Sequence, residues 1–211
     1  MVNRSIRNIF TSLLTVAICL FSMQVYAELG EKEQAYYDNY QSILQVMKKG
    51  MDSAPKTGDP SLDFLYEMIP HHEAAVSMAE NILKYGSNEQ VKKLATAIVH
   101  DQLKGIAQME ALLKKLKQNP QVDKAKEAAY LKVYNKAHNE MMKAMEEAKP
   151  TGNIDRDFLE EMIPHHEGAV KMASNILNYT NNEELKAIAQ NIVTSQQKQL
   201  EEMKQLLQTI R

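Results

Sequence analysis

A ten-residue segment, Glu-Met-Ile-Pro-His-His-Glu-x-Ala-Val, occurs twice in this chain, at residues 67–76 and again at residues 161–170. The similarity extends beyond the segment, since residues 63–83 and 157–177 are identical at 17 of 21 positions with a constant offset of 94 residues. Self-similarity at a fixed offset indicates two copies of one structural unit that pack against each other. We therefore expect a first repeat over residues 28–120 and a second over residues 121–211, each with its own Met/His site.

The methionines follow the same offset. Five of them have a partner 94 residues later, so that Met47, Met51, Met68, Met78 and Met109 correspond to Met141, Met145, Met162, Met172 and Met203. Among the residues after position 27, only Met142 lacks such a partner. A thioether is a soft ligand, so paired methionines beside a repeated His-His pair point to a soft-metal site.

The hydrophobic pattern is helical along the chain. Apolar residues recur every three to four positions, no stretch alternates apolar and polar residues, and the chain has 7 glycines and 6 prolines. Polar caps at Asn88 and Asn182 are typical of helix starts. We predict an all-α helical bundle with up-down packing, in which a pseudo-two-fold axis relates two three-helix repeats. The six predicted helices span residues 31–51, 59–85, 88–117, 123–148, 155–179 and 182–210.

The first 27 residues have the features of a secretory signal peptide. Two arginines precede an apolar run at residues 13–21, and small-residue character at Ala27 is typical of a cleavage site. An uncleaved membrane anchor is the alternative. With cleavage after Ala27, we expect a periplasmic or secreted protein that does not associate with the membrane.

The composition after residue 27 excludes several classes of protein. The leader takes two arginines with it, which leaves 23 basic and 27 acidic residues, a net charge of −4 and no basic surface for nucleic acid. No cysteine remains, so the chain is not a disulfide scaffold and a soft metal must bind thioether or imidazole. Neither a cysteine nor a serine nucleophile signature is present, and we expect no enzyme activity.

Both histidines of each pair lie on the apolar face of their predicted helix. At 100° per residue with Met68 at zero, His71 lies at about −60°, His72 at about +40° and Met78 at about −80°. The second copy repeats this layout with Met162, His165, His166 and Met172. A buried imidazole needs a partner for its ring nitrogens, which is either a metal ion or a hydrogen-bond network.

Two further methionines in each repeat have the spacing to chelate one ion. Met47 and Met51 lie four residues apart on one helix face, as do Met141 and Met145. Methionine also fills helical cores, which is the alternative interpretation and the better one for Met109 and Met203. Thioether and imidazole ligands favour copper(I) and with it silver(I). The predicted metal ligands are Met47, Met51, Met68, His71, His72, Met78, Met141, Met145, Met162, His165, His166 and Met172.

Several neighbouring residues have two interpretations at this stage. Glu67 and Glu73 are either acceptors for imidazole N–H groups or solvated carboxylates. Pro70, like Pro164, either bends its helix or marks a late helix start. Since His100 and His138 have no histidine counterpart, we expect both to be exposed. With an ordinary imidazole pKa of about 6.5, copper(I) binding should weaken near pH 5.

Three rival interpretations compete with copper(I). Zinc usually takes thiolate or carboxylate as its remaining ligands. A di-iron bundle oxidoreductase needs Glu-x-x-His, but Met68 stands three residues before His71 and Met162 three before His165. A structural or adaptor bundle with satisfied core histidines is the third interpretation, and metal titration distinguishes it.

The repeated motif also resembles a known family. Asp63-Phe64, Met68-Ile69-Pro70-His71-His72, Ala75 and Met78-Ala79 are similar to the signature of domain-of-unknown-function family 305, and the second copy follows from Asp157 to Ala173. The resemblance covers essentially the whole chain after the leader. It implies a ferritin-like bundle that binds copper(I) and silver(I) through Met and His, with a role in copper buffering, trafficking or resistance. Copper ions are the expected partners, together with an unidentified metal-delivery protein.

Overall fold

In the computed structural model, residues 29–210 are described, and this range forms six α-helices and no strand. The helices are α1 (Glu31–Asp52), α2 (Pro60–Tyr85), α3 (Glu89–Leu116), α4 (Lys124–Glu147), α5 (Ile154–Ile176) and α6 (Glu183–Thr209). Every predicted helix end lies within three residues of the observed one, and the all-α prediction is confirmed. The expected signal peptide lies outside the described residues. Within them, no helix is both long and apolar enough to cross a membrane.

Polar side chains cap five of the six helices at their N-termini. Each accepts a hydrogen bond from a backbone N–H of the first turn, and the caps are Asp59, Asn88, Asp123, Asn153 and Asn182. The predicted caps at Asn88 and Asn182 are thus confirmed. Asp59 and Asn153, like Asn88 and Asn182, are equivalent residues of the two repeats, so local sequence sets the starts of these helices in both copies.

Helix α2 continues through Pro70, and α5 continues through Pro164. The late-start interpretation is wrong, because α2 already begins at Pro60, where proline suits the first helical turn. Pro70 packs closely on α1, since a Cβ atom built on Gly50 would lie only 2.8 Å from Cβ of Pro70. Glycine at position 50 therefore permits the close approach of α1 to the part of α2 that precedes the histidines.

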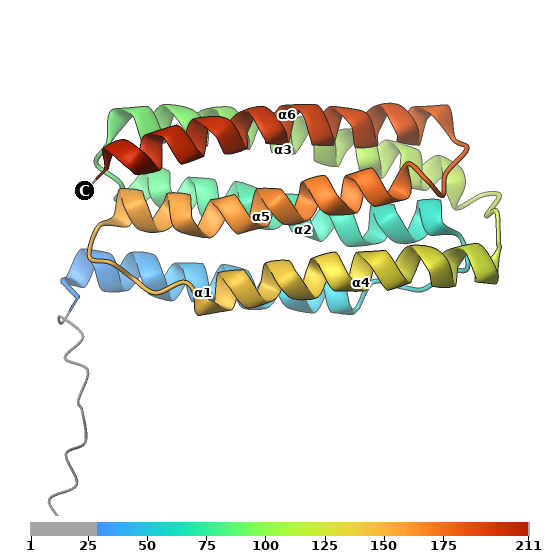
Figure 1. Cartoon of the computed structure of the whole chain (residues 1–211), viewed down its shortest axis with the longest axis horizontal. Coiled ribbons are helices and arrows are strands. Elements are labelled where there is room, and N and C mark those ends of the chain that lie inside the picture. Colours follow the sequence, from blue (N-terminus) through green and yellow to red (C-terminus); the bar gives the residue numbers. More distant parts are fainter. Residues whose placement is uncertain (1–28, 211) are drawn as a thin grey trace, which may run out of the picture.

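The six helices lie roughly along one long axis in three tiers, with α1 and α4 in one tier, α2 and α5 in the middle, and α3 and α6 in the third (Figure 1). Helix α2 packs against α1, α3 and α5, and α5 packs against α4, α6 and α2. Helices α2 and α5 run in opposite directions (Figure 1). Buried apolar residues of all six helices form one cluster, so the two repeats share a core.

The segment between α3 and α4 is bound to the loop between α1 and α2. The N–H of Asp123 donates to the carbonyl of Gly58 at 2.8 Å, and the N–H of Gln121 donates to the carboxylate of Asp59 at 2.7 Å. Gly58 has a φ of 88°, and a Cβ atom there would lie 2.8 Å from the side chain of Val122. The connection between the repeats is therefore held against the first repeat, while the boundary at residue 120 stays a prediction.

Candidate metal centre

The four histidines of the repeated motif form one row across the interface of α2 and α5. The ring centroids of His71 and His165 lie 3.7 Å apart, with 5.9 Å from His71 to His72 and 5.8 Å from His165 to His166. None of the four is more than 3 % exposed. Because α2 and α5 cross with equivalent residues at their contact, the two His pairs meet at the centre of the bundle. The sequence predicts one Met/His site in each repeat, and the fold brings the histidines of both copies together.

Five ring nitrogens of these histidines are buried without a hydrogen-bond partner. They are Nδ1 and Nε2 of His71, Nδ1 of His72, Nδ1 of His165 and Nδ1 of His166. Buried polar atoms are nearly always paired, and a metal ion is one partner that an imidazole nitrogen can take. The chemistry of these atoms therefore fits a metal ion at the centre of the bundle.

Burial keeps the four imidazoles neutral. Loss of hydration lowers the pKa of His72 to about 3 and that of His166 to about 4, where the hydrogen bond to the side-chain oxygen of Gln199 limits the decrease. Burial also lowers the pKa of His71 and of His165 well below the ordinary value, and repulsion from the neighbouring histidines adds to the decrease. Only a neutral imidazole has a lone pair for a metal, so these rings are in the binding form at neutral pH.

The eight predicted methionine ligands all lie in the shared core. Each is at most 3 % exposed, and they come from α1, α2, α4 and α5. Met141 reaches over α5, because a Cβ atom on Gly168 would lie 2.5 Å from its sulfur atom. Gly168 is one turn after His165, so the thioether of Met141 lies against the helix that carries the second His pair. Met109 and Met203 are fully buried, as expected for core residues.

A surface pocket reaches one of these methionines. It has a volume of 270 Å³ and is lined by α1 and α2, including Val46, Met47, Pro70 and Ala74. Val46 is 72 % exposed beside the buried Met47. The pocket brings solvent close to the thioether of Met47 in the first repeat.

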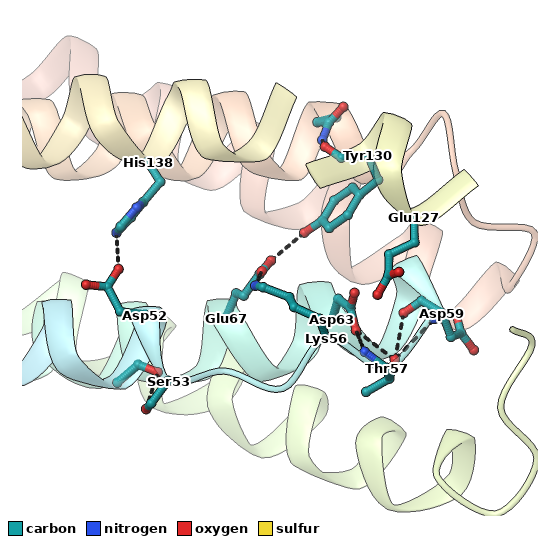
Figure 2. A network of polar contacts seen from close by, with 12 residues as sticks. Asp52, Ser53, Lys56, Thr57, Asp59, Asp63, Glu67, Glu127, Tyr130 and His138 are labelled. Atoms are coloured by element: carbon teal, nitrogen blue, oxygen red, sulfur yellow. Dashed lines mark hydrogen bonds and ion pairs between the residues drawn. The ribbon is translucent and has the colours of Figure 1, made fainter. Parts of the chain in front are cut away.

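Glu67 and its counterpart Glu161 are buried, and both bond to tyrosines. Glu67 accepts a hydrogen bond from the hydroxyl of Tyr130 at 2.7 Å and pairs with Lys56 (Figure 2). Glu161 accepts a hydrogen bond from the hydroxyl of Tyr36 at 2.6 Å. The two alternatives for Glu67, an imidazole acceptor or a solvated carboxylate, are therefore both wrong. Glu73 is exposed, as expected for a solvated carboxylate.

Sequence reasoning missed these crossed tyrosine–glutamate pairs. Tyr36 and Tyr130 are 94 residues apart, as are Glu67 and Glu161. The repeat offset could therefore have marked these four residues as two equivalent pairs. Each tyrosine donates to the glutamate of the other repeat. Burial raises the pKa of Glu67 to about 7 against the lowering effect of Lys56, and burial raises the pKa of Glu161 well above its ordinary value. These carboxyls are engaged away from the histidine row, Glu67 with Tyr130 and Lys56 and Glu161 with Tyr36.

The two single histidines differ from each other. His100 is exposed, as predicted, and lies beside Asp101. The prediction for His138 is wrong, since it is 7 % exposed and stacks on Tyr134, with its Nε2 3.9 Å from Asp52 (Figure 2). The ring fills the space between α4 and the end of α1, where its counterpart in the first repeat is Leu44.

The donor set as a whole is poor in hard ligands. In residues 29–210, no three side chains of His, Cys, Asp and Glu are grouped so as to hold a metal ion. Thioethers are the further donors that the methionine spacing predicts. Which of the predicted methionines and histidines bind the ion stays a prediction.

The family model described as "Domain of unknown function (DUF305)" matches residues 61–207, a range that includes both copies of the motif. The chain belongs to the DUF305 family. The resemblance of the motif is thereby confirmed. Among other relatives, the uncharacterized protein L153 of Acanthamoeba polyphaga mimivirus is 40% identical over 53 residues, which are 25% of this chain. That match spans 35% of the mimivirus protein.

Several solved structures have a similar fold. CopM in an Ag-bound form is 31% identical, with a TM-score of 0.54 over 71% of this chain and 95% of that chain. CopM in the Cu(I)-bound form is 32% identical, with a TM-score of 0.54 over 71% and 96%. A DUF305 fragment from Deinococcus radiodurans is 28% identical, with a TM-score of 0.54 over 72% and 97%. These likenesses cover nearly the full length of the solved chains.

Proposed function

We propose that this DUF305 protein binds copper(I), and also silver(I), through methionine and histidine side chains at the centre of its bundle. It buffers or carries the ion in the periplasm or outside the cell, for copper trafficking or resistance, and catalyses no reaction. The observation that carries the proposal is the row of neutral, buried imidazoles with five unpartnered nitrogens among buried thioethers. The solved CopM structures with Cu(I) and with Ag support it.

The charge of the site favours a monovalent ion. Imidazole and thioether ligands are neutral, and the buried carboxyls of Glu67 and Glu161 have raised pKa values and bond to tyrosines. A buried cation without a compensating anion is costly, and the cost rises steeply with charge. Copper(I) and silver(I) therefore suit this environment better than zinc or iron(II), which also prefer harder ligands.

Metal titration under reducing conditions tests the proposal. We expect the chain to compete with a chromophoric copper(I) chelator and to bind silver(I) by calorimetry, with much weaker binding of zinc and iron(II). A variant in which His71, His72, His165 and His166 are replaced by Phe removes every imidazole of the row, and far-UV circular dichroism checks its fold. Binding of zinc or iron(II) in preference to copper(I) would overturn the proposal, and no metal binding at all would favour a structural bundle.

A further inference from the structure

The histidine pair of the second repeat has a hydrogen-bond relay that the first repeat lacks. The side-chain carbonyl of Gln199 on α6 lies 2.9 Å from Nε2 of His166, and its amide nitrogen donates to the carboxylate of Asp101 on α3 at 3.0 Å. Gln199 is 6 % exposed. In the first repeat the residue at the position of Gln199 is Gly105, which has no side chain to offer His72.

The chemistry of Asp101 fixes the direction of the relay. An ionised carboxylate only accepts hydrogen bonds, so the NH₂ group of Gln199 must face Asp101 and its oxygen must face His166. That oxygen also only accepts, so Nε2 of His166 must carry the proton. The lone pair of this neutral ring is then on Nδ1, which is buried and has no hydrogen-bond partner. Hydrogen bonds of this type commonly set the tautomer of a metal-binding histidine.

His165 is held in the same tautomer by a different acceptor. Its Nε2 lies 3.1 Å from the backbone carbonyl of His71, which can only accept. Its Nδ1 is likewise buried and unpartnered. Both histidines of the second repeat thus direct an Nδ1 lone pair into the core.

The first repeat has no side-chain acceptor like Gln199. The backbone carbonyls of His165 and Met68 lie near His71 and His72 and act against the lowering of their pKa values, but both ring nitrogens of His71 and Nδ1 of His72 lack a hydrogen bond of full geometry. The ring of His72 lies against Gly105, because a Cβ atom there would be 3.1 Å from its Cδ2 and 3.4 Å from its Nε2. Without a side chain that fixes its tautomer, this pair is less preorganised for a metal than the second pair.

We infer that Gln199, held by Asp101, is a positioning residue that presents Nδ1 of His166 as a ligand atom, so that the second repeat binds copper(I) or silver(I) more tightly than the first. This inference rests on the proposed function. Loss of a residue that orients a metal-binding histidine typically weakens metal binding about 10- to 100-fold. The repeated motif is identical in its histidines, and the difference between the two sites arises on the neighbouring helices.

Two-bond ¹H–¹⁵N spectra of the metal-free chain test the first half of the inference, because they report which nitrogen of each histidine is protonated. We expect His166 and His165 to show the Nε2–H tautomer only. In Gln199→Leu the acceptor is lost and His166 should show a mixture of tautomers. A protonated Nδ1 on His166 in the unsubstituted chain would overturn the inference.

Silver(I) titration followed by the same histidine signals tests the second half. We expect the signals of His165 and His166 to change before those of His71 and His72, and Gln199→Leu to weaken the second site about tenfold or more. Asp101→Ala, a change at a half-exposed position, should weaken it in the same direction. Gln196→Leu is the control, since Gln196 is buried on α6 without a hydrogen bond to these histidines. Equal filling of the two repeats by silver(I) overturns the inference, and so does a Gln199→Leu variant whose silver(I) affinity equals that of Gln196→Leu. If the unsubstituted chain binds no silver(I), the proposed function is overturned instead.

Discussion

Individual histidines in this protein are set to remain neutral by burial. His72 and His166 have pKa values lowered to about 3 and about 4, mainly because burial removes hydration from the charged ring. The expectation of weaker copper(I) binding near pH 5 used the ordinary pKa of about 6.5. It should be revised, because at pH 5 these folded imidazoles have no proton to lose when a metal binds.

The lowered pKa of His72 predicts a pH-dependent stability. The unfolded chain binds a proton at His72 below about pH 6.5, whereas the folded chain binds it only near pH 3. The contribution of His72 to the free energy of unfolding is therefore fully present above pH 6.5 and is lost as the pH falls below that value. Between pH 7 and pH 5 the loss should be about 2 kcal/mol for this residue. Glu67, with its pKa raised to about 7, acts in the opposite direction, since its contribution is lost as the pH rises from about 4.5.

Comparison of the metal-free chain with His72→Gln isolates the histidine term, because both proteins keep Glu67. Urea unfolding at pH 7 and at pH 5 gives, for each protein, the loss of unfolding free energy between the two pH values. This loss should be about 2 kcal/mol smaller in the variant than in the unsubstituted chain. Equal pH dependence in the two proteins would mean that His72 is protonated in the folded state at pH 5.

At the scale of helices, the sequence predicted all six helices and placed each of their ends within three residues of the observed one. Polar caps such as Asn88 and Asn182 and the 3.6-residue period are local signals, and local signals determine where helices begin and end. The partners of Glu67 and the surroundings of His138 were not predictable in the same way. Both depend on which residue of a different helix lies opposite, and that follows only from how α4 packs against α1 and α2.

The methionines of α1 give a prediction at this scale. Met47 and Met51 lie one turn apart, both buried, on a helix that packs against α2 and its histidines. Replacing both by Leu roughly conserves volume and apolarity, so stability should change by less than about 1.5 kcal/mol per site. If the thioethers are ligands, copper(I) affinity in the first repeat should fall at least about tenfold.

Met109→Leu is the matched control, because Met109 is fully buried on α3 and was assigned to the core. A chelator-competition titration of both variants gives the affinities, and thermal unfolding gives the stabilities. Unchanged copper(I) affinity in the Met47→Leu, Met51→Leu variant would mean that both methionines only pack in the core and are not ligands. The predicted site in the first repeat would then consist of Met68, Met78 and the histidines.

At the scale of the whole molecule, crossed hydrogen bonds join the two repeats around the site. Tyr36 donates to Glu161 and Tyr130 donates to Glu67, so a tyrosine of each repeat supplies a hydrogen bond to a buried carboxyl of the other. The hydroxyl of Tyr40 also donates to the backbone carbonyl of Met145 in the second repeat, at 2.8 Å. The rings of His71 and His165, with centroids 3.7 Å apart, lie at the same interface. The row of four histidines and the contact between the repeats are therefore one structure, which a single repeat would not contain.

The pair of Tyr36 and Glu161 allows this coupling to be measured. Tyr36→Phe removes the hydroxyl and leaves the buried carboxyl of Glu161 without this donor, a loss that should cost about 1–3 kcal/mol of unfolding free energy. Tyr37→Phe is the control on the same helix, because Tyr37 is only partly buried and should change stability by no more than about 0.5 kcal/mol. Urea unfolding followed by circular dichroism gives both values. Because Tyr36 bonds to the opposite repeat, the loss should lower the stability of the whole bundle in one transition, and a second transition or equal effects of the two changes would contradict a shared polar core.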